Sequence, residues 1–288
     1  MTNGVSLRNI KIPSHFPGNT ENDCPFFWRQ QLTEWGNLSD MIKLIRNELH
    51  ISGCVIIRDF NVFELDMNLK KIFFLGLCSL IGNPIEHNLG KKDYIWDIKL
   101  RENASLLPTF SEHNSEAPLH TDTQYRLNPE KYISLFALKK ARCGGGETTI
   151  LQFEDVIRTL QNTTNGQDCL YVLKNSLFPF AVPSVFSRDK NQVHWIFAPI
   201  ISDKKSIRYR FDTIDQGLRY SNLSEADNTK QVWALHFFRE HITSHSSVVK
   251  LSLEDGEILI LDNERVLHGR TSFSDPNRHI LRARMNDW

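Results

Sequence analysis

The chain has 288 residues, of which 40% are hydrophobic and 24% charged, so it can bury a sizeable core and belongs to the ordinary globular class. Its 34 basic and 34 acidic side chains cancel to a formal charge of zero, which argues against a nucleic-acid binder and against attraction to an anionic membrane surface. We therefore expect neither nucleic acid nor a membrane as a partner.

The N-terminal stretch MTNGVSLRNIKIPSHF lacks the apolar core of a signal peptide, and no later apolar run is long enough to span a bilayer. The expected location is the cytoplasm. No repeat or low-complexity tract divides the chain, so the sequence predicts a single domain over residues 1–288. The cysteines show no C-x-x-C pair, and we interpret them as free thiols: Cys24, Cys54, Cys78, Cys143 and Cys169.

In the first half of the chain, apolar residues at helical spacing predict a helix over residues 39–53, followed by a β-branched strand over residues 54–60. A second helix is predicted over residues 69–82. The next segment, about residues 88–118, is rich in Asn, Glu, Ser and Pro and shows no periodicity. Loops of this length in compact domains are usually lids or binding loops. We expect a lid there.

Strand signals dominate from Tyr132 onward, and a single long helical pattern, roughly Ser224 to Thr243, interrupts them. Many short strands without alternating helices predict a mainly β fold with flanking helices, and a double-stranded β-helix (jelly roll) fits best. The strands are predicted over residues 132–141, 147–153, 168–175, 194–201, 208–212, 248–253, 257–262 and 278–285.

The stretch EAPLHTDTQYR contains the pair His120 and Asp122. With 11 histidines and 34 acidic residues in the chain, about one H-x-[DE] is expected by chance, so the pair alone proves nothing. On a strand, residues i and i+2 project to the same face and could bind one ion. His268, after the apolar strand in EDGEILILDNERVLHGR, is the candidate third ligand. Two histidines and one carboxylate suit a non-haem Fe(II) oxygenase.

Such an oxygenase needs electrons, and the chain has no flavin or haem fingerprint to supply them. 2-Oxoglutarate can do so by chelating the iron and losing carbon dioxide, and its remote carboxylate then needs a clamp. PNRHILRARM offers Arg278 and Arg282, four apart on a predicted strand and so on one face. Thr148, at a strand start in CGGGETTI, adds a hydroxyl donor.

The order H-T-D, G-G-x-T, LDNERVLHGR and R-x-x-x-R resembles the taurine-dioxygenase-like superfamily of Fe(II)/2-oxoglutarate oxygenases and its clavaminate-synthase-like relatives. SGCVIIRDFNV is also similar to the first core strand of that family. The resemblance runs from about residue 45 to the C-terminus. It implies the double-stranded β-helix fold, with Fe(II) as cofactor and with 2-oxoglutarate and dioxygen as cosubstrates.

Carried over position by position, the resemblance also implies roles for individual residues. His120, Asp122 and His268 would bind the iron. Thr148 and Arg278 would hold the distal carboxylate of 2-oxoglutarate, and Arg282 would contact the primary substrate. Because the spacing from His268 to Arg278 is short for the family, an alignment shifted by a gap would give Arg282 the cosubstrate role instead. No other catalytic residue is implied.

The sequence therefore predicts an enzyme that couples decarboxylation of 2-oxoglutarate by dioxygen to oxidation of a C–H bond, above all by hydroxylation. The expected substrate is a small amino-acid-like or anionic metabolite. Desaturation and oxidative rearrangement, isonitrile formation included, stay open, because relatives with the same ligands perform them. A non-catalytic jelly-roll binding protein that has kept a metal site is the alternative from another class, and the complete set of ligands plus clamp argues against it.

Overall fold

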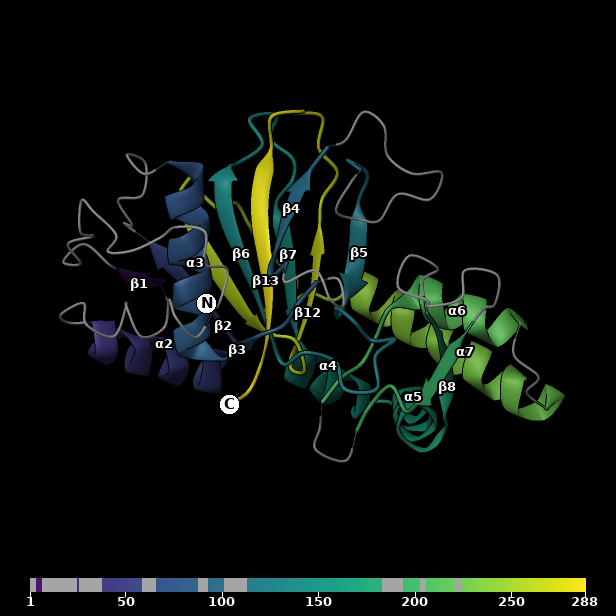
Figure 1. The fold of residues 1–288 in the computed structure, drawn as a ribbon. Coiled ribbons are helices and arrows are strands. Elements are labelled where there is room, and N and C mark those ends of the chain that lie inside the picture. The colour runs from purple at the N-terminus through teal and green to yellow at the C-terminus, as the bar shows by residue number, and fades with distance from the viewer. Residues whose placement is uncertain are drawn as a thin grey trace.

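Two β-sheets with helices on their outer sides form the described part of the chain in this computed structural model (Figure 1). The structure describes residues 4–6, 25, 38–58, 66–87, 93–100, 113–182, 194–202, 206–220 and 224–288. The prediction of a single domain over residues 1–288 stays a prediction.

The larger sheet has seven strands, in the order β1-β2-β11-β6-β13-β3, with β4 also paired to β13. Its pairs are antiparallel except for β1 with β2. The strands are β1 (Gly4–Ser6), β2 (Cys54–Arg58), β3 (Asn83–Pro84), β4 (Ile95–Lys99), β6 (Tyr132–Lys139), β11 (Ile258–Asp262) and β13 (His279–Asn286).

The smaller sheet has four antiparallel strands in the order β10-β7-β12-β5. They are β5 (Ala117–His120), β7 (Thr148–Gln152), β10 (Val249–Leu251) and β12 (Val266–Arg270). A separate hairpin joins β8 (Phe178–Ala181) to β9 (Trp195–Ala198). The predicted mainly β, double-stranded β-helix architecture is confirmed.

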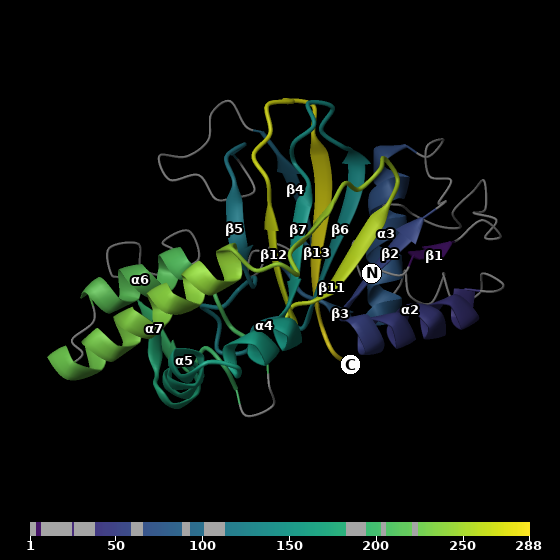
Figure 2. The ribbon, with the colours of Figure 1, turned by 180° about the vertical axis from the view of Figure 1, so that it is seen from behind.

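Helices lie on both outer sides of the sheets, as Figures 1 and 2 show from opposite directions. Helices α2 (Leu38–Ser52) and α3 (Met67–Ile81) cover the larger sheet. The other side carries α4 (Phe153–Leu160), α5 (Thr164–Asn175), α6 (Phe211–Tyr220) and α7 (Glu225–Thr243).

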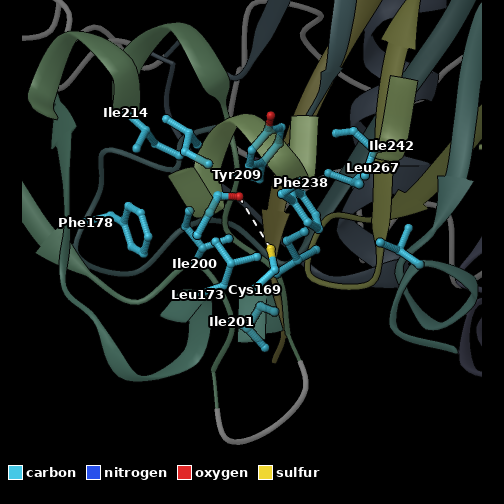
Figure 3. Packing of buried hydrophobic residues seen from close by; sticks show 14 of the residues in the cluster. Cys169, Leu173, Phe178, Ile200, Ile201, Tyr209, Ile214, Phe238, Ile242 and Leu267 are labelled. Atoms are coloured by element: carbon cyan, nitrogen blue, oxygen red, sulfur yellow. Dashed lines mark hydrogen bonds between the residues drawn. The ribbon is translucent and has the colours of Figure 1, made fainter. Parts of the chain in front are cut away.

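Three apolar clusters hold these layers together. One joins α2 and α3 to the larger sheet, and a second joins α4 to α7 to the smaller sheet. Figure 3 shows the second cluster, where the buried Cys169 thiol donates to the Ala234 carbonyl over 3.5 Å. The third cluster contains residues of both sheets, among them Ile150, Val266 and Ile280, and therefore fills the space between them. Burial of this apolar surface is the main force that brings the two sheets together.

The strand predicted over residues 168–175 is wrong, because these residues belong to helix α5. The buried residues of α5 are Gly166, Cys169 and Leu173, which follow a helical spacing, whereas Tyr171 is 70% exposed. The strand predicted over residues 208–212 is also wrong, because α6 begins at Phe211. Residues 208–212 alternate between polar and aromatic side chains, and residues 169–173 form a short apolar run that a buried strand and a helix can share. Tertiary packing overrides both signals.

Two further sequence predictions need correction. Helix α4 was not predicted, although its buried Phe153, Val156 and Leu160 have helical spacing. The segment 88–118 was expected to lack regular structure, but it contains β4, which pairs along β13. Residues 88–92 and 101–112, where the rest of the predicted lid lies, fall outside the described residues. The other predicted strands and the three predicted helices are confirmed within a few residues.

The cysteines that the structure describes, Cys54, Cys78, Cys143 and Cys169, are free thiols as predicted. Cys24 lies outside the described residues. Among the described helices, none has the length and apolar character needed to cross a membrane.

Asp262, the last residue of β11, is 5% exposed, and burial raises its pKa to about 6 even though it accepts the Glu264 N–H. Because the native pKa lies above the unfolded value, the native state binds the extra proton between about pH 4 and pH 6, and the free energy of unfolding falls as the pH rises through this window. Asp262→Asn cannot ionise and keeps the acceptor oxygen. Relative to the native protein, we expect the free energy of unfolding of the variant to rise by up to about 3 kcal/mol between pH 4 and pH 8.

Urea unfolding at a series of pH values measures this difference. Asp40→Asn, at an exposed position on α2, is the control and should follow the native curve. If the free energy of unfolding depended on pH in the same way for the native protein and for Asp262→Asn, the pKa of Asp262 would not be raised in the native state.

Candidate metal centre

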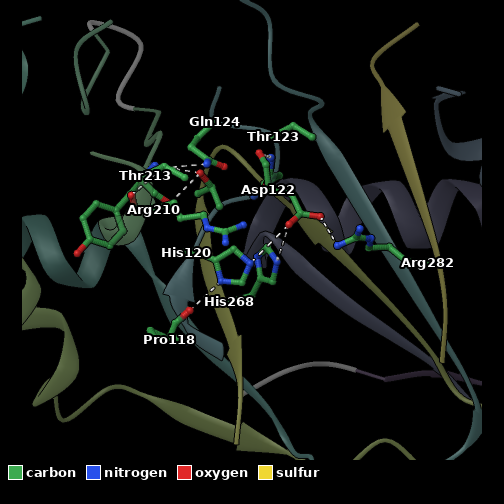
Figure 4. Close-up of polar contacts among 12 residues, drawn as sticks. Pro118, His120, Asp122, Thr123, Gln124, Arg210, Thr213, His268 and Arg282 are labelled. Atoms are coloured by element: carbon green, nitrogen blue, oxygen red, sulfur yellow. Dashed lines mark hydrogen bonds and ion pairs between the residues drawn. The ribbon is translucent and has the colours of Figure 1, made fainter. Parts of the chain in front are cut away.

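His120 and His268 are brought together by the pairing of β5 with β12. The two residues are direct cross-strand partners in the smaller sheet, and their ring centroids lie 4.6 Å apart. His268 lies inside β12 and does not follow the end of a strand, as the sequence had suggested. Although residues 121–267 separate them in the chain, this pairing sets the two imidazoles side by side (Figure 4).

Asp122 joins the two histidines from the turn after β5. One carboxylate oxygen lies 3.5 Å from His120 Nε2 and 3.9 Å from His268 Nε2. All three side chains are buried, and one ligand atom from each lies within 4.8 Å of the others. Ligands at right angles on a divalent ion lie about 3 Å apart, so small adjustments would close this group around one ion. The donor set is the two-histidine, one-carboxylate type that suits divalent iron.

The ionisation states of these groups suit metal binding. Burial, together with the charge of His120, lowers the pKa of His268 to about 3, so its ring is neutral and keeps a lone pair. His120 Nδ1–H donates to the Pro118 carbonyl over 2.7 Å, which directs Nε2 toward Asp122. Burial acts to raise the pKa of Asp122, but Arg282 and the two histidines more than offset it, so the pKa lies well below its usual range.

The turn that carries Asp122 differs from the predicted geometry. β5 ends at His120, so strand alternation does not place Asp122 beside it. Instead the chain turns at Asp122, and Thr123 adopts a left-handed conformation with a φ of 53°. The H-x-D spacing was the right signal, but the reason given for it, a continuous strand, was wrong.

The two arginines of R-x-x-x-R occupy different surroundings. The Arg282 guanidinium lies 3.0 Å from Asp122 and is partly buried beside it. Arg278 directly precedes β13, and the register shift near His279 leaves an extra residue on β6, because β13 pairs with β4 without interruption from His279 to Ala283. The prediction that both arginines lie on one face of the strand stays a prediction.

Arg278 is a buried cation without a counter-charge among the described residues. It is 6% exposed, Nη1 has no hydrogen-bond partner, and burial lowers its pKa to about 10. Its guanidinium lies over the Phe273 ring at 5.0 Å. Gly146 lies beside it, two residues before Thr148, so the structure brings the predicted hydroxyl and the predicted cation to the same end of the smaller sheet.

A cavity of about 630 Å³ reaches His120 from the side of α6 and α7. Its wall includes Arg210 and Asp212, which form a bidentate ion pair with two 2.8 Å contacts. Hydrogen bonds join this segment to the turn after β5: the Thr121 N–H donates to the Tyr209 carbonyl, and Gln124 donates to Thr213. These contacts therefore hold the segment that carries Arg210 and Thr213 next to the turn after His120 (Figure 4).

Sequence reasoning missed three polar residues of this region. Asn263 contacts the backbone of Asp122, and its position in LDNERVLH, between two apolar strands, was a usable signal for a buried turn. Arg210 and Asp212 lie in a segment that was interpreted as a strand. An R-x-D pair has no spacing rule that would mark it as part of a site.

The family model of the taurine catabolism dioxygenase TauD, TfdA family matches residues 21–167 and 183–284. Among curated proteins, the dioxygenase str8 of Strobilurus tenacellus is 24% identical over 200 residues, which are 67% of this chain and 43% of that protein. The chain therefore spans less than half the length of this curated relative.

Among solved structures, asparagine oxygenase in complex with Fe(II), 2S,3S-3-hydroxyasparagine and succinate is similar, with a TM-score of 0.72, 16% identity and coverage of 95% of this chain and 86% of that one. The non-heme iron oxygenase OrfP in complex with Fe, succinate and (3S)-hydroxy-L-Arg gives a TM-score of 0.69 at 13% identity, covering 99% and 94% of the two chains. These likenesses confirm the fold. Because the family model matches most of its length, the chain belongs to the taurine catabolism dioxygenase TauD, TfdA family.

Proposed function

We propose that the protein is an Fe(II)/2-oxoglutarate-dependent dioxygenase that hydroxylates a C–H bond of a small amino-acid-like substrate. The observation that carries this proposal is the meeting of His120, Asp122 and His268 in one buried group. The iron, with 2-oxoglutarate and dioxygen, would supply the oxidising power, and succinate and carbon dioxide would be the coproducts. The chain itself would supply ligands, a carboxylate clamp and a closed site.

Arg278 and Thr148 are the residues proposed to hold the distal carboxylate of 2-oxoglutarate. An arginine that is buried without a counter-anion is costly, and a carboxylate that forms two parallel hydrogen bonds with it removes that cost. Arg282 already has an anionic neighbour in Asp122, which supports Arg278 in this role. Arg282 would then contact the primary substrate on the Asp122 side of the centre.

The proposed substrate class, a free or peptide-like amino acid, has two supports. The similar solved structures contain hydroxylated asparagine and hydroxylated arginine. The wall of the cavity beside His120 carries both cations and carboxylates: Arg210, Arg239, Lys250, Asp212 and Glu116. A wall with both signs of charge is suited to a molecule that carries an amine and a carboxylate.

Replacing His268 with alanine tests the metal centre and the reaction together. The native protein with Fe(II) and 2-oxoglutarate under anaerobic conditions should show a weak visible charge-transfer band. In air it should form succinate in response to an amino-acid substrate, whose product gains one oxygen by mass spectrometry. His268→Ala should lose the band and the succinate, because one of three protein ligands is gone.

His236→Ala, on the partly exposed side of α7, is the control and should keep both signals. If His268→Ala retained the band and the turnover, the ligand assignment would be wrong. If the product had instead lost two hydrogens, the reaction would be a desaturation and not a hydroxylation, and the proposed cofactors would stay the same.

Arg278→Ala should weaken the binding of 2-oxoglutarate to the metal-loaded protein by at least tenfold, because a charge-assisted contact contributes about 1.5–3 kcal/mol. Calorimetric titration measures the dissociation constant. Arg282→Ala is the matched variant, since it removes an equal side chain from the same strand region. We expect it to alter 2-oxoglutarate binding less. The opposite ranking would transfer the clamp to Arg282.

Gly146 is predicted to make room for the Arg278 side chain. Gly144 and Gly146 have similar left-handed φ values of 81° and 76°, so alanine strains the backbone comparably at both. A Cβ at Gly146 would lie 3.1 Å from Arg278 Nε, whereas a Cβ at Gly144 meets nothing within 4 Å. Gly146→Ala should therefore weaken 2-oxoglutarate binding by roughly threefold to tenfold, a partial loss of the arginine contact.

Gly144→Ala serves as its control, with a comparable fall in unfolding temperature and unchanged 2-oxoglutarate affinity. If both variants bound 2-oxoglutarate with equal affinity, Gly146 would be needed only for the left-handed backbone of its loop and not for the Arg278 side chain.

A further inference from the structure

The orientation of the Asp122 side chain depends on a strained turn in the backbone. His120 is held in the ladder between β5 and β12, but the ladder ends there, and the next residues leave the sheet. The left-handed φ of 53° at Thr123 is unfavourable for a β-branched residue, which rarely adopts it without outside support. Something other than local preference must therefore hold the backbone at Asp122.

The Asn263 side chain supplies contacts on both sides of that backbone unit. Its Oδ1 accepts the Asp122 N–H over 2.8 Å, and its Nδ2 donates to the Asp122 carbonyl over 3.1 Å. The same Nδ2 group donates to the Glu130 carbonyl over 2.8 Å. Asn263 is 1% exposed, so no water competes for these groups.

A second contact fixes the other half of the turn. The Thr123 hydroxyl donates to the Glu130 carboxylate, which also pairs with Arg126. Glu130 is 1% exposed, and its backbone carbonyl is one of the acceptors of Asn263. Asn263 thus holds the backbone at Asp122, Glu130 holds the side chain of Thr123, and a hydrogen bond from Asn263 to the Glu130 carbonyl connects the two.

Asn263 also belongs to the segment that carries the other histidine. It lies in the turn between β11 and β12, five positions before His268, and its own N–H donates to the Lys131 carbonyl over 2.6 Å. One buried amide therefore connects the backbone at Asp122 to the turn that starts the strand of His268. Its placement fixes the separation of two segments that are far apart in the sequence.

We propose that Asn263 is a positioning residue that sets the geometry between Asp122 and His268 and so determines the affinity of the site for a divalent metal ion. The inference rests on the proposed metal centre and goes beyond it, because Asn263 would ligate nothing itself. Outer contacts that orient metal ligands commonly change metal affinity tenfold to a hundredfold.

Asn263→Asp is the sharpest variant, because it has the same shape and keeps the oxygen that accepts the Asp122 N–H. It removes both Nδ2 contacts and sets an anionic oxygen against two carbonyls. We expect the affinity for Fe(II), measured anaerobically by calorimetry with Fe(II) alone, to fall at least tenfold. Two controls accompany it: Asn228→Ala, which removes an amide contact between α6 and α7, and Leu173→Ala, which destabilises the apolar cluster of α4 to α7.

Both controls should bind Fe(II) like the native protein, although Leu173→Ala lowers the unfolding temperature. The inference fails if Asn263→Asp binds Fe(II) with native affinity, or if Leu173→Ala loses affinity to the same extent. Should Asn263→Asp not fold, Thr123→Val, which keeps the shape and loses the hydroxyl contact to Glu130, carries the same test and should weaken Fe(II) binding about threefold or more. A native protein that binds no Fe(II) would overturn the metal centre itself, a result distinct from these.

Discussion

An ionised carboxylate buried between the two sheets is the interaction on which the centre of the molecule depends. Asp122 is 7% exposed, and its pKa lies well below the usual range despite burial. A charge removed from water is costly unless opposite charge and hydrogen bonds compensate for it. Arg282 supplies the opposite charge at 3.0 Å, and both imidazoles lie beside the carboxylate. The carboxylate and the two imidazoles together form a donor set that suits a divalent cation.

At the other end of the smaller sheet, a buried cation needs an opposite charge in the same way. Arg278 is buried against Phe273 with its Nη1 unpaired, and the charge of Arg270 lies close enough to lower its pKa further. The interior of the molecule thus holds a buried anionic group, Asp122, and a buried cationic group, Arg278. A dicarboxylate that contacts an ion at one end and an arginine at the other would compensate both sites at once.

Much of this could be predicted from the sequence, for reasons that differ between the fold and the site. Apolar strands such as residues 257–262 and 132–141 are buried on both faces, so their β-branched and aromatic runs were unambiguous. Helix α5 was missed because its short apolar run, Cys169 to Leu173, is also typical of a buried strand, and only its packing against α7 decides the outcome. Helices α4 to α6 are stabilised by one shared apolar cluster, and the sequence of a single segment does not show that cluster.

The site, too, could be predicted from the sequence only in part. His120, Asp122 and His268 were found because metal ligation demands particular residue types in a fixed order, and order is visible in a sequence. The turn at Thr123 and the contacts of Asn263 were not predicted, because both depend on backbone conformation and on a partner 141 residues away. Asp122 lies beside Arg282 and Phe273 beside Arg278, and the R-x-x-x-R pattern alone indicates neither neighbour.

A crystal structure of the protein grown without oxygen in the presence of Fe(II) and 2-oxoglutarate tests the central claim most directly. The account predicts one metal ion ligated by His120, Asp122 and His268, with 2-oxoglutarate bound to it and its distal carboxylate on Arg278 and Thr148. Metal density at any other place, or a distal carboxylate held by Arg282, would contradict it.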